Sequence, residues 1–274
     1  FPSSVPGETG AWAMALGPDN QVYVGSLPAA HVQRLDWAQR KLVDMGRPSE
    51  TESYIWQLAL ASDDKLYGCT YPGAKLVRFD PATGEGEDLG RMDEAEQYAR
   101  SVAADDKGFV YVGIGMGNMH LVAYEIATGE HRDILPPELV KPGCVGVHRG
   151  DDGKVYAVAG GPQFVLDGWT ATPVEAGQVR PEPPLALVDG STVGYTGPSI
   201  TVTKPGGQPQ SLATGYKGKE KGIFRIAFGP DGQLYGSTAM PIHFFTADPD
   251  GDAIEEIGLA GGGEFYSFLP WGGK

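Results

Sequence analysis

Short stretches in which apolar and polar residues alternate recur along almost the whole chain. Five of them run into an Asp/Gly turn and then into a second alternating stretch with a central tyrosine: AWAMALGPDNQVYVG, IWQLALASDDKLYGCT, ARSVAADDKGFVYVG, VGVHRGDDGKVYAV and FRIAFGPDGQLYGST. Alternation with a period of two residues indicates half-buried β-strands. The tyrosines are Tyr23, Tyr67, Tyr111, Tyr156 and Tyr235, with first intervals of 44, 44 and 45 residues. The last interval, 79 residues, leaves room for a degenerate unit around LALVDGSTVGYTG.

Each unit continues in the same way. A third strand follows (HVQRLD, KLVRFD, HLVAYE or HFFTAD), and a fourth closes the unit (EDLG, HRDIL or EEIG). Between them, Gly84 and Gly129 can supply the positive φ of a hairpin turn. Four short antiparallel strands in roughly 40–45 residues is the period of a propeller blade. We therefore predict an all-β fold, a β-propeller of four-stranded antiparallel blades.

The repeat predicts a single propeller domain over residues 1–274, with six full blades and a partial seventh. The predicted blades are 11–53, 54–97, 98–143, 144–184, 185–222 and 223–263, with the partial blade at 264–274. Rings usually close with strands from both termini, because an open ring exposes strand edges. Either the last of seven positions is partial, or the natural chain continues past Lys274. The ending WGGK, where a second strand should begin, favours the second interpretation.

Two segments carry a resemblance to known proteins. The runs SDDKLYGCTYPGAKLVRFDPATGEGEDLG and FGPDGQLYGST resemble the blade repeat of the streptogramin-lyase-like and related bacterial seven-bladed propellers. The resemblance extends over nearly the whole chain but lies in structural residues, so it implies the fold rather than one function. That group includes lyases, lactonases, polysaccharide-degrading enzymes and pure binding modules. No catalytic set of these families maps onto this chain residue by residue.

Charge and composition argue against some classes of binding partner. The formal net charge of −14 argues against a general binder of nucleic acid or anionic membranes, which needs a basic face. No apolar run reaches the roughly 20 residues of a membrane span. The 41 glycines and 22 prolines fit many tight turns. Cys69 and Cys144 show no metal-ligand spacing, and we interpret them as buried free thiols.

The repeat also shows which residues share the face that usually carries a propeller's site. On that face the innermost strands begin and the hairpins between second and third strands lie. The aligned starts of the innermost strands are Trp12, Trp56, Arg100, Val145, Phe224 and Tyr266, followed by positions that include Gln57, Ser101, Arg225 and Ser267. One register at the start of the third strands holds His31, Lys75, His120 and His243. Upstream lie Tyr54, Tyr98, Lys141 and the cluster Tyr216, Lys217, Lys219 and Lys221, and the same face carries Glu50, Glu52, Glu94 and Glu96.

A locally basic mouth on an acidic body favours an anionic ligand. We expect an anionic carbohydrate, a uronate or sulfated polysaccharide, or another small anion, with Trp12, His31, Trp56, Gln57 and Lys75 binding it. Such a site could perform β-elimination. Arg100 or Arg225 would neutralise the developing charge, His120 or His243 would act as the base, and Tyr98 or Tyr266 as the acid.

Each candidate also has a structural interpretation. The histidines could cap hairpins, Trp12 and Trp56 could belong to the core, and the arginines could form salt bridges with Glu94, Glu96 or Glu264. We expect no metal site, because histidines on different blades lie too far apart to share an ion. No cofactor is expected, and a structural divalent cation is left open.

Three functions therefore compete. The first is an enzyme on an anionic polysaccharide, a lyase. The second is a non-catalytic ligand-binding or protein-interaction propeller, one domain of a longer protein, with an additional domain or a partner chain closing the ring. The third, a metal-dependent lactonase or hydrolase, ranks last because few carboxylates stand at the starts of the innermost strands. The compartment stays open, and an extracellular or periplasmic location would suit a carbohydrate-active protein.

Overall fold

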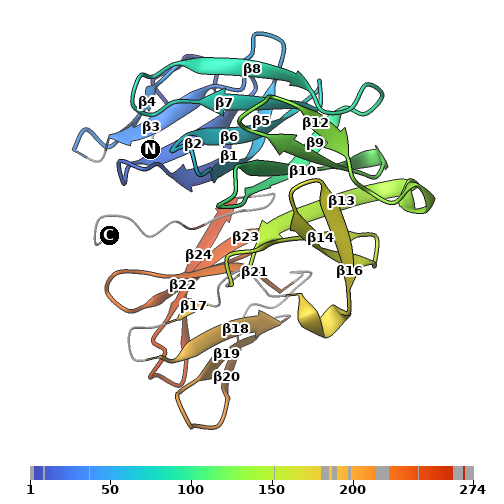
Figure 1. The fold of residues 1–274 in the computed structure, drawn as a ribbon. Helices are drawn as coiled ribbons and strands as arrows, with labels where there is room; N and C mark the ends of the chain where they lie inside the picture. Colours follow the sequence, from blue (N-terminus) through green and yellow to red (C-terminus); the bar gives the residue numbers. More distant parts are fainter. Residues whose placement is uncertain are drawn as a thin grey trace. The chain divides into compact units, whose positions relative to one another are not determined.

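The described part of the chain consists almost entirely of β-strands (Figure 1). In this computed structural model the described residues are 3–8, 10–36, 38–150, 152–179, 185–186, 190–196, 199–213, 222–239, 241–261 and 268. Their contacts divide the chain into two compact units, Phe1–Glu182 and Pro183–Lys274, and each unit is described by itself. Two 3-10 turns, Pro137–Leu139 and Ala176–Gln178, interrupt the strands of the first unit.

The first unit contains two separate four-stranded antiparallel sheets and one eight-stranded sheet. The first sheet comprises β1 (Gly10–Leu16), β2 (Val22–Leu27), β3 (Val32–Asp36) and β4 (Lys41–Asp44), in that order. The second comprises β5 (Tyr54–Leu60), β6 (Leu66–Tyr71), β7 (Lys75–Phe79) and β8 (Gly86–Arg91).

The eight-stranded sheet joins two sets of four strands. One set is β9 (Tyr98–Ala104), β10 (Phe109–Asn118), β11 (His120–Glu125) and β12 (His131–Asp133). The other is β13 (Pro142–Arg149), β14 (Val155–Ala159), β15 (Gln163–Asp167) and β16 (Thr170–Val174). The sets are continuous because β10 pairs with β13 as well as with β9 and β11.

The second unit contains two four-stranded antiparallel sheets among its described residues. One comprises β17 (Leu185–Ala186), β18 (Thr192–Thr196), β19 (Ser199–Thr203) and β20 (Gln210–Ala213). The other comprises β21 (Ile223–Phe228), β22 (Leu234–Thr238), β23 (Ile242–Ala247) and β24 (Ile254–Gly261). The prediction of an all-β fold with four-stranded antiparallel sheets is confirmed, whereas the number and bounds of the blades stay predictions.

The repeated Asp and Tyr residues form one local structure. In each of the five repeat segments the tyrosine hydroxyl donates to an aspartate of the preceding turn: Tyr23–Asp19 2.9 Å, Tyr67–Asp63 3.0 Å, Tyr111–Asp105 3.0 Å, Tyr156–Asp152 2.9 Å and Tyr235–Asp231 2.8 Å. The other oxygen of the same carboxylate accepts a backbone N–H two residues on, as in Lys107 to Asp105 at 2.8 Å. The turn and the second strand are therefore held together by one side chain.

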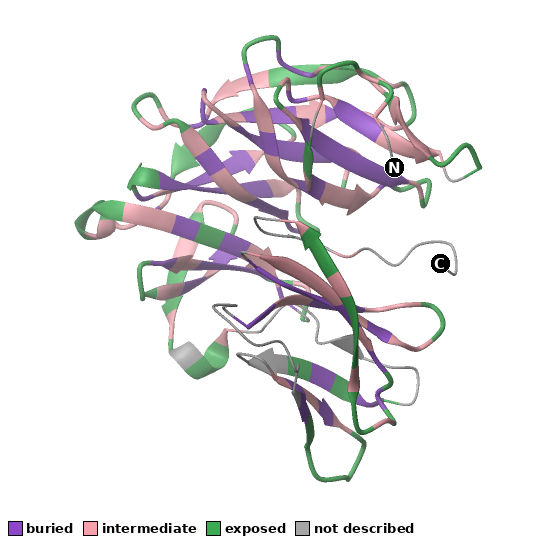
Figure 2. Cartoon of the chain, turned by 180° about the vertical axis from the view of Figure 1, so that it is seen from behind, coloured by how far each residue is buried: buried purple, intermediate pink, exposed green. Residues whose placement is uncertain are grey.

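Apolar side chains fill the space on both faces of the second strands in the first unit. In β2 and β6 five of six residues are buried, so these strands lack the alternation of a sheet with one wet face (Figure 2). One buried cluster contains Tyr23 and Val32 of the first sheet with Ile55, Leu66 and Phe79 of the second. Packing between neighbouring sheets thus forms the core of the first unit. No helix in the described residues is both long and apolar enough to cross a membrane.

Candidate functional site

A β-bulge occurs at the same aligned position in the first strand of four sheets. The pairing register skips one residue in each of β1, β5, β9 and β21, and the skipped residues are Trp12, Trp56, Arg100 and Phe224. A bulge adds an unpaired residue and redirects its side chain. These are four of the six positions that the repeat aligned at the starts of the innermost strands. Of the other two, Val145 pairs in unbroken register with Ala159, and Tyr266 lies outside the described residues.

Three of the bulge residues come together in the first unit. The rings of Trp12 and Trp56 stack with centroids 4.0 Å apart and an interplanar angle of 11°. The guanidinium carbon of Arg100 lies 4.0 Å from the centroid of the Trp56 ring. Side chains from three successive sheets thus form one continuous stack.

Three tyrosines surround this stack. The ring centroid of Tyr54 lies 5.1 Å from that of Trp12 and 5.1 Å from that of Tyr71. The ring centroid of Tyr98 lies 4.3 Å from that of Tyr71 and 5.9 Å from that of Trp56. We call Trp12, Tyr54, Trp56, Tyr71 and Tyr98 the aromatic platform; all five side chains are half-buried. Sequence reasoning missed Tyr71. Its signal was its place at the end of β6, where it pairs directly with Tyr54.

The Arg100 guanidinium makes neither a hydrogen bond nor an ion pair with any residue that the structure describes. Of the carboxylates weighed as partners, Glu94 lies 3.8 Å from Arg91, and Glu96 accepts backbone N–H groups. Glu264 lies outside the described residues. Arginine carries five N–H donors and stays charged in proteins. The half-buried guanidinium on Trp56 therefore presents its donors without a carboxylate of the described residues to neutralise it.

Tyr98 is a protonated donor beside Arg100. Burial raises the pKa of Tyr98, and its hydrogen bond with Tyr71 and the neighbouring tyrosines raise it further, while the charge of Arg100 lowers it less. The hydroxyl consequently keeps its proton at neutral pH, as the acid role predicted for it requires.

Three of the cationic residues at the start of the third strands have an aspartate partner, which sequence reasoning missed. An aspartate 13 residues later lies within reach in three sheets: His31 Nδ1–Asp44 Oδ1 2.9 Å, Lys75 Nζ–Asp88 Oδ2 2.6 Å and His120 Nδ1–Asp133 Oδ2 2.7 Å. Each pair links the third strand of a sheet to its fourth. His120 Nε2 also lies 3.7 Å from Asp93. These contacts give the three residues a structural partner, and their predicted roles in substrate binding and catalysis stay predictions.

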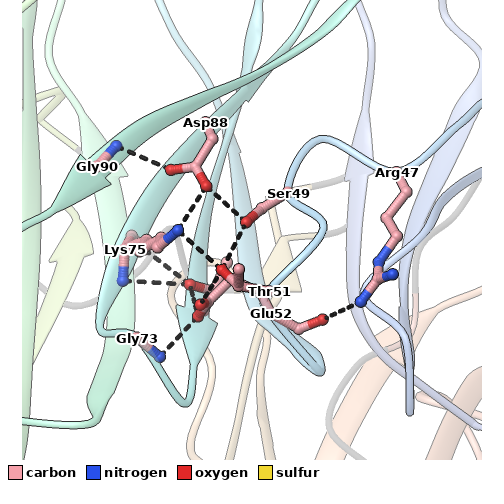
Figure 3. A network of polar contacts seen from close by, with 9 residues as sticks. Arg47, Ser49, Thr51, Glu52, Gly73, Lys75, Asp88 and Gly90 are labelled. Carbon is pink, nitrogen blue, oxygen red and sulfur yellow. Dashed lines mark hydrogen bonds and ion pairs between the residues drawn. The ribbon is translucent and has the colours of Figure 1, made fainter.

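Figure 3 shows the most extended of these pairs. Lys75 Nζ donates to Asp88 and, at 2.8 Å, to Thr51, while Ser49 donates to Asp88 at 2.6 Å. Partial burial alone would raise the pKa of Asp88, but hydrogen bonds from Lys75, Ser49 and the Gly90 backbone outweigh it and hold that pKa below its usual value. Asp88 is therefore ionised at neutral pH and neutralises Lys75.

A repeated glutamate fixes the hairpin between the second and third strands. Glu8, Glu52 and Glu96 each accept a backbone N–H from the residue 21 positions later: Ala29 at 2.8 Å, Gly73 at 2.8 Å and Gly117 at 3.1 Å. Glu52 is 1% exposed and also accepts from Thr70 at 2.7 Å. Each glutamate precedes its bulge residue by four positions, so it ties the hairpin to the start of the first strand.

The remaining predicted residues are dispersed. Gln57 Oε1 accepts the N–H of Val102 at 3.1 Å, which links β5 to β9. In the second unit, Arg225 lies 4.5 Å from the Phe224 ring and donates to the Phe224 carbonyl at 2.8 Å, and the backbone N–H of His243 donates to Thr238 at 2.9 Å. Arg225 and His243 are not placed relative to Arg100 and His120, because they belong to the other unit.

The cysteines and the acidic residues form no metal site in the described part of the chain. Cys69 and Cys144 are free, and burial raises the pKa of the Cys69 thiol to about 12. Burial also raises the pKa of Cys144, although the charge of Arg100 lowers it somewhat. Within the described residues no group of three or more His, Cys, Asp or Glu side chains is arranged to hold a metal ion.

No protein-family model and no curated protein matches this sequence. Solved structures do match it. Selenomethionine-substituted virginiamycin B lyase from Staphylococcus aureus superposes with a TM-score of 0.60 at 14% identity, over 92% of this chain and 85% of that chain. A catalytically inactive histidine-to-alanine variant of that lyase, solved with quinupristin, gives a TM-score of 0.61 at 13% identity over the same shares. An auxiliary nutrient binding protein from Bacteroides thetaiotaomicron gives 0.52 at 12% identity, over 91% of this chain and 69% of that one.

At these identities the likeness shows the fold alone. The expected resemblance to streptogramin-lyase-like propellers is confirmed at that level. The similar structures include lyases and a binding protein, so they leave the choice of function to the site.

Proposed function

We propose that this propeller binds an anionic carbohydrate at Arg100 and the aromatic platform. The observation that carries the proposal is the half-buried Arg100 guanidinium, stacked on Trp56 and paired with no carboxylate of the described residues. A guanidinium presents parallel N–H donors that match the two oxygens of a carboxylate or sulfate group. The neighbouring rings offer flat apolar surface, as ligand sites with a few polar groups usually do. A uronate or sulfated sugar supplies both an anion and apolar ring faces.

The charge of the whole protein supports a specific contact rather than general attraction. A body with a formal charge of −14 repels anions at long range, so an anionic ligand needs a local cation that the protein has not already neutralised. Lys75 is paired with Asp88, and Arg91 donates to the carbonyls of Asp93 and Glu96. Arg100 differs from both because its described surroundings are aromatic rather than acidic.

Binding is tested by calorimetric titration with an oligogalacturonate and with a neutral oligosaccharide of equal length. Arg100→Met should weaken binding of the acidic ligand. A hydrogen bond to a charged group contributes about 1.5–3 kcal/mol, which corresponds to a loss of about 10- to 100-fold.

Arg132→Met is the matched control. Arg132 also lies over a tryptophan, 4.4 Å from the Trp169 ring, but it is paired with Glu130. We expect this variant to bind like the wild type. Equal affinity for neutral and acidic ligands, or unchanged affinity in Arg100→Met, would refute the proposal.

Elimination chemistry is the second candidate, and the observation in its favour is the 2.7 Å contact that orients His120 against Asp133. In this reaction His120 takes the proton from the carbon beside the substrate carboxylate, and the electron pair of the broken C–H bond forms a C=C bond. The bond to the leaving oxygen breaks, and that oxygen takes the proton of Tyr98. Arg100 offsets the charge that develops on the carboxylate.

Turnover is followed by the absorbance of the new double bond. His120→Ala should abolish it, whereas His31→Ala should not, although His31 makes the same type of contact with Asp44 in the first sheet. If both variants lose similar stability and neither changes turnover, His120 is only a structural residue. If the wild type binds the acidic ligand without any rise in absorbance, elimination is refuted and the binding proposal stands.

A further inference from the structure

The second strand of the third set, β10, differs from its counterparts. It spans ten residues, Phe109–Asn118, whereas β2 and β6 span six each. Its extra residues reach the next set, with Gly115 opposite both Tyr98 of β9 and Cys144 of β13, and Asn118 opposite Pro142. The end of β10 is therefore paired with both β9 and β13.

This crossing requires glycine. A Cβ atom at Gly113 would lie 2.2 Å from the carbonyl oxygen of Val145, and one at Gly115 would lie 2.4 Å from the Cα of Cys144. Both contacts are with backbone atoms, which cannot rotate away. The two glycines thus allow the backbone of β10 to approach β13 closely enough to pair.

Glu96 fixes the end of the same segment. Its two carboxylate oxygens accept the N–H groups of Gly117 at 3.1 Å and Asn118 at 2.7 Å. A Cβ atom at Gly117 would lie 2.4 Å from the Glu96 carboxylate. The backbone on both sides of Met116 is consequently fixed, by β13 before it and by Glu96 after it.

Met116 itself is the unexpected residue of this segment. It has φ +82°, a region that L side chains rarely adopt, although both its neighbours are glycines. Its side chain is 64% exposed, so packing within the protein does not explain why a methionine stands there. Strained residues of this kind cluster at ligand-binding sites.

The register places Met116 at the edge of the aromatic platform, one residue beyond the partner of Tyr98. The preceding residue, Gly115, pairs directly with Tyr98, and Arg100 follows Tyr98 by two positions on the same strand. A methionine side chain is flexible and polarisable, and it adapts its shape to a ligand. The segment therefore presents an apolar, adaptable group on the strand that pairs with the strand of Tyr98 and Arg100.

We propose that Met116 is a specificity-determining residue of this site, contacting an apolar substituent beside the anionic group of the ligand. This inference rests on the proposed function. The substrate class that fits both groups is a uronate that carries an acyl substituent, with the carboxylate on Arg100 and the acyl methyl against the thioether of Met116.

The test compares the affinities of an O-acetylated oligogalacturonide and its deacetylated form. The wild type should prefer the acetylated ligand by at least about fivefold. Met116→Gly should bind the deacetylated form like the wild type and lose that preference. Its stability should not fall, because glycine adopts φ +82° without strain. Asn20→Gly is the control, since Asn20 is also exposed with φ +58° but lies in the turn between β1 and β2.

The outcomes separate the two proposals. If the wild type binds both ligands equally, or if Met116→Gly keeps the preference, the role of Met116 is refuted while anion binding by Arg100 stands. If the wild type binds neither ligand, the proposed function fails, and the role of Met116 fails with it. A preference lost in both Met116→Gly and Asn20→Gly would show a general effect of glycine substitution and would also refute the inference.

Discussion

Replacing Tyr111 by phenylalanine removes one hydroxyl group from the most buried of the repeated Asp–Tyr turns. Tyr111 is fully buried and donates to Asp105, which is 7% exposed, at 3.0 Å. Asp105 also accepts the N–H groups of Lys107 at 2.8 Å and Phe109 at 2.9 Å. Burial and the charge of Asp105 both raise the pKa of Tyr111, so the hydroxyl remains a proton donor throughout the neutral range.

The expected loss in the free energy of unfolding depends on how far the acceptor, Asp105, is buried. A hydrogen bond to a charged group contributes about 1.5–3 kcal/mol, and a buried carboxylate cannot replace the lost donor with water. We expect Tyr111→Phe to lower the free energy of unfolding by about 2 kcal/mol. In Tyr23→Phe the same bond, 2.9 Å long, is lost from Asp19, which is exposed. Water can replace that donor, so we expect a loss below about 1 kcal/mol.

Urea unfolding followed by circular dichroism measures both variants, and an unchanged dependence on urea concentration shows that the same surface unfolds. A double-mutant cycle with Asp105→Ala then isolates the pair energy. Equal losses in Tyr111→Phe and Tyr23→Phe would refute the argument that burial of the carboxylate sets the energy. A loss under about 0.5 kcal/mol in Tyr111→Phe would show that the ring alone stabilises the turn.

Two further predictions follow from the same unit. Because Asp88 has a lowered pKa in the folded protein, its stabilising effect is complete above about pH 4 and is lost as the pH falls through the folded-state pKa. Lys75→Met should therefore flatten the acid limb of a plot of stability against pH, and an unchanged limb would contradict this. Gly113→Ala should lower the free energy of unfolding by about 1–3 kcal/mol or more, because its Cβ would lie 2.2 Å from the Val145 carbonyl oxygen. A melting temperature close to that of the wild type would contradict this prediction.

The repeat made the sheets predictable because strand alternation and turn chemistry are local. The Asp and Tyr residues of each unit lie close in sequence, and their hydrogen bond follows from that spacing. The pairs between third and fourth strands, such as His31 with Asp44, have partners 13 residues apart in each unit and were readable in principle. They were missed because the alignment followed the tyrosines and the acidic residue at the end of the third strand, and not the aspartates of the fourth strand.

The arrangement of the site was not predictable in the same way. The repeat aligned Trp12, Trp56 and Arg100 but could not show that each sits at a bulge, because a bulge depends on the register between strands. The pairing of β10 with β13 joins two sets of strands and has no local sequence pattern beyond its glycines. Whether Arg100 finds a carboxylate depends on where Glu94 and Glu96 point, and the sequence left that open.

The glutamates that hold the hairpins bind main-chain N–H groups and not side chains. Glu8, Glu52 and Glu96 therefore hold three hairpins of different sequence, LPAA, YPGA and GMGN, by the same contact. Anchoring of this kind separates the position of a loop from its chemical identity. Residues at the tips other than the close-packed glycines Gly73, Gly115 and Gly117 can be exchanged, one loop at a time, while the backbone that presents them stays in place. The protein thus offers a scaffold on which new ligand preferences can be selected or engineered without rebuilding the sheets beneath.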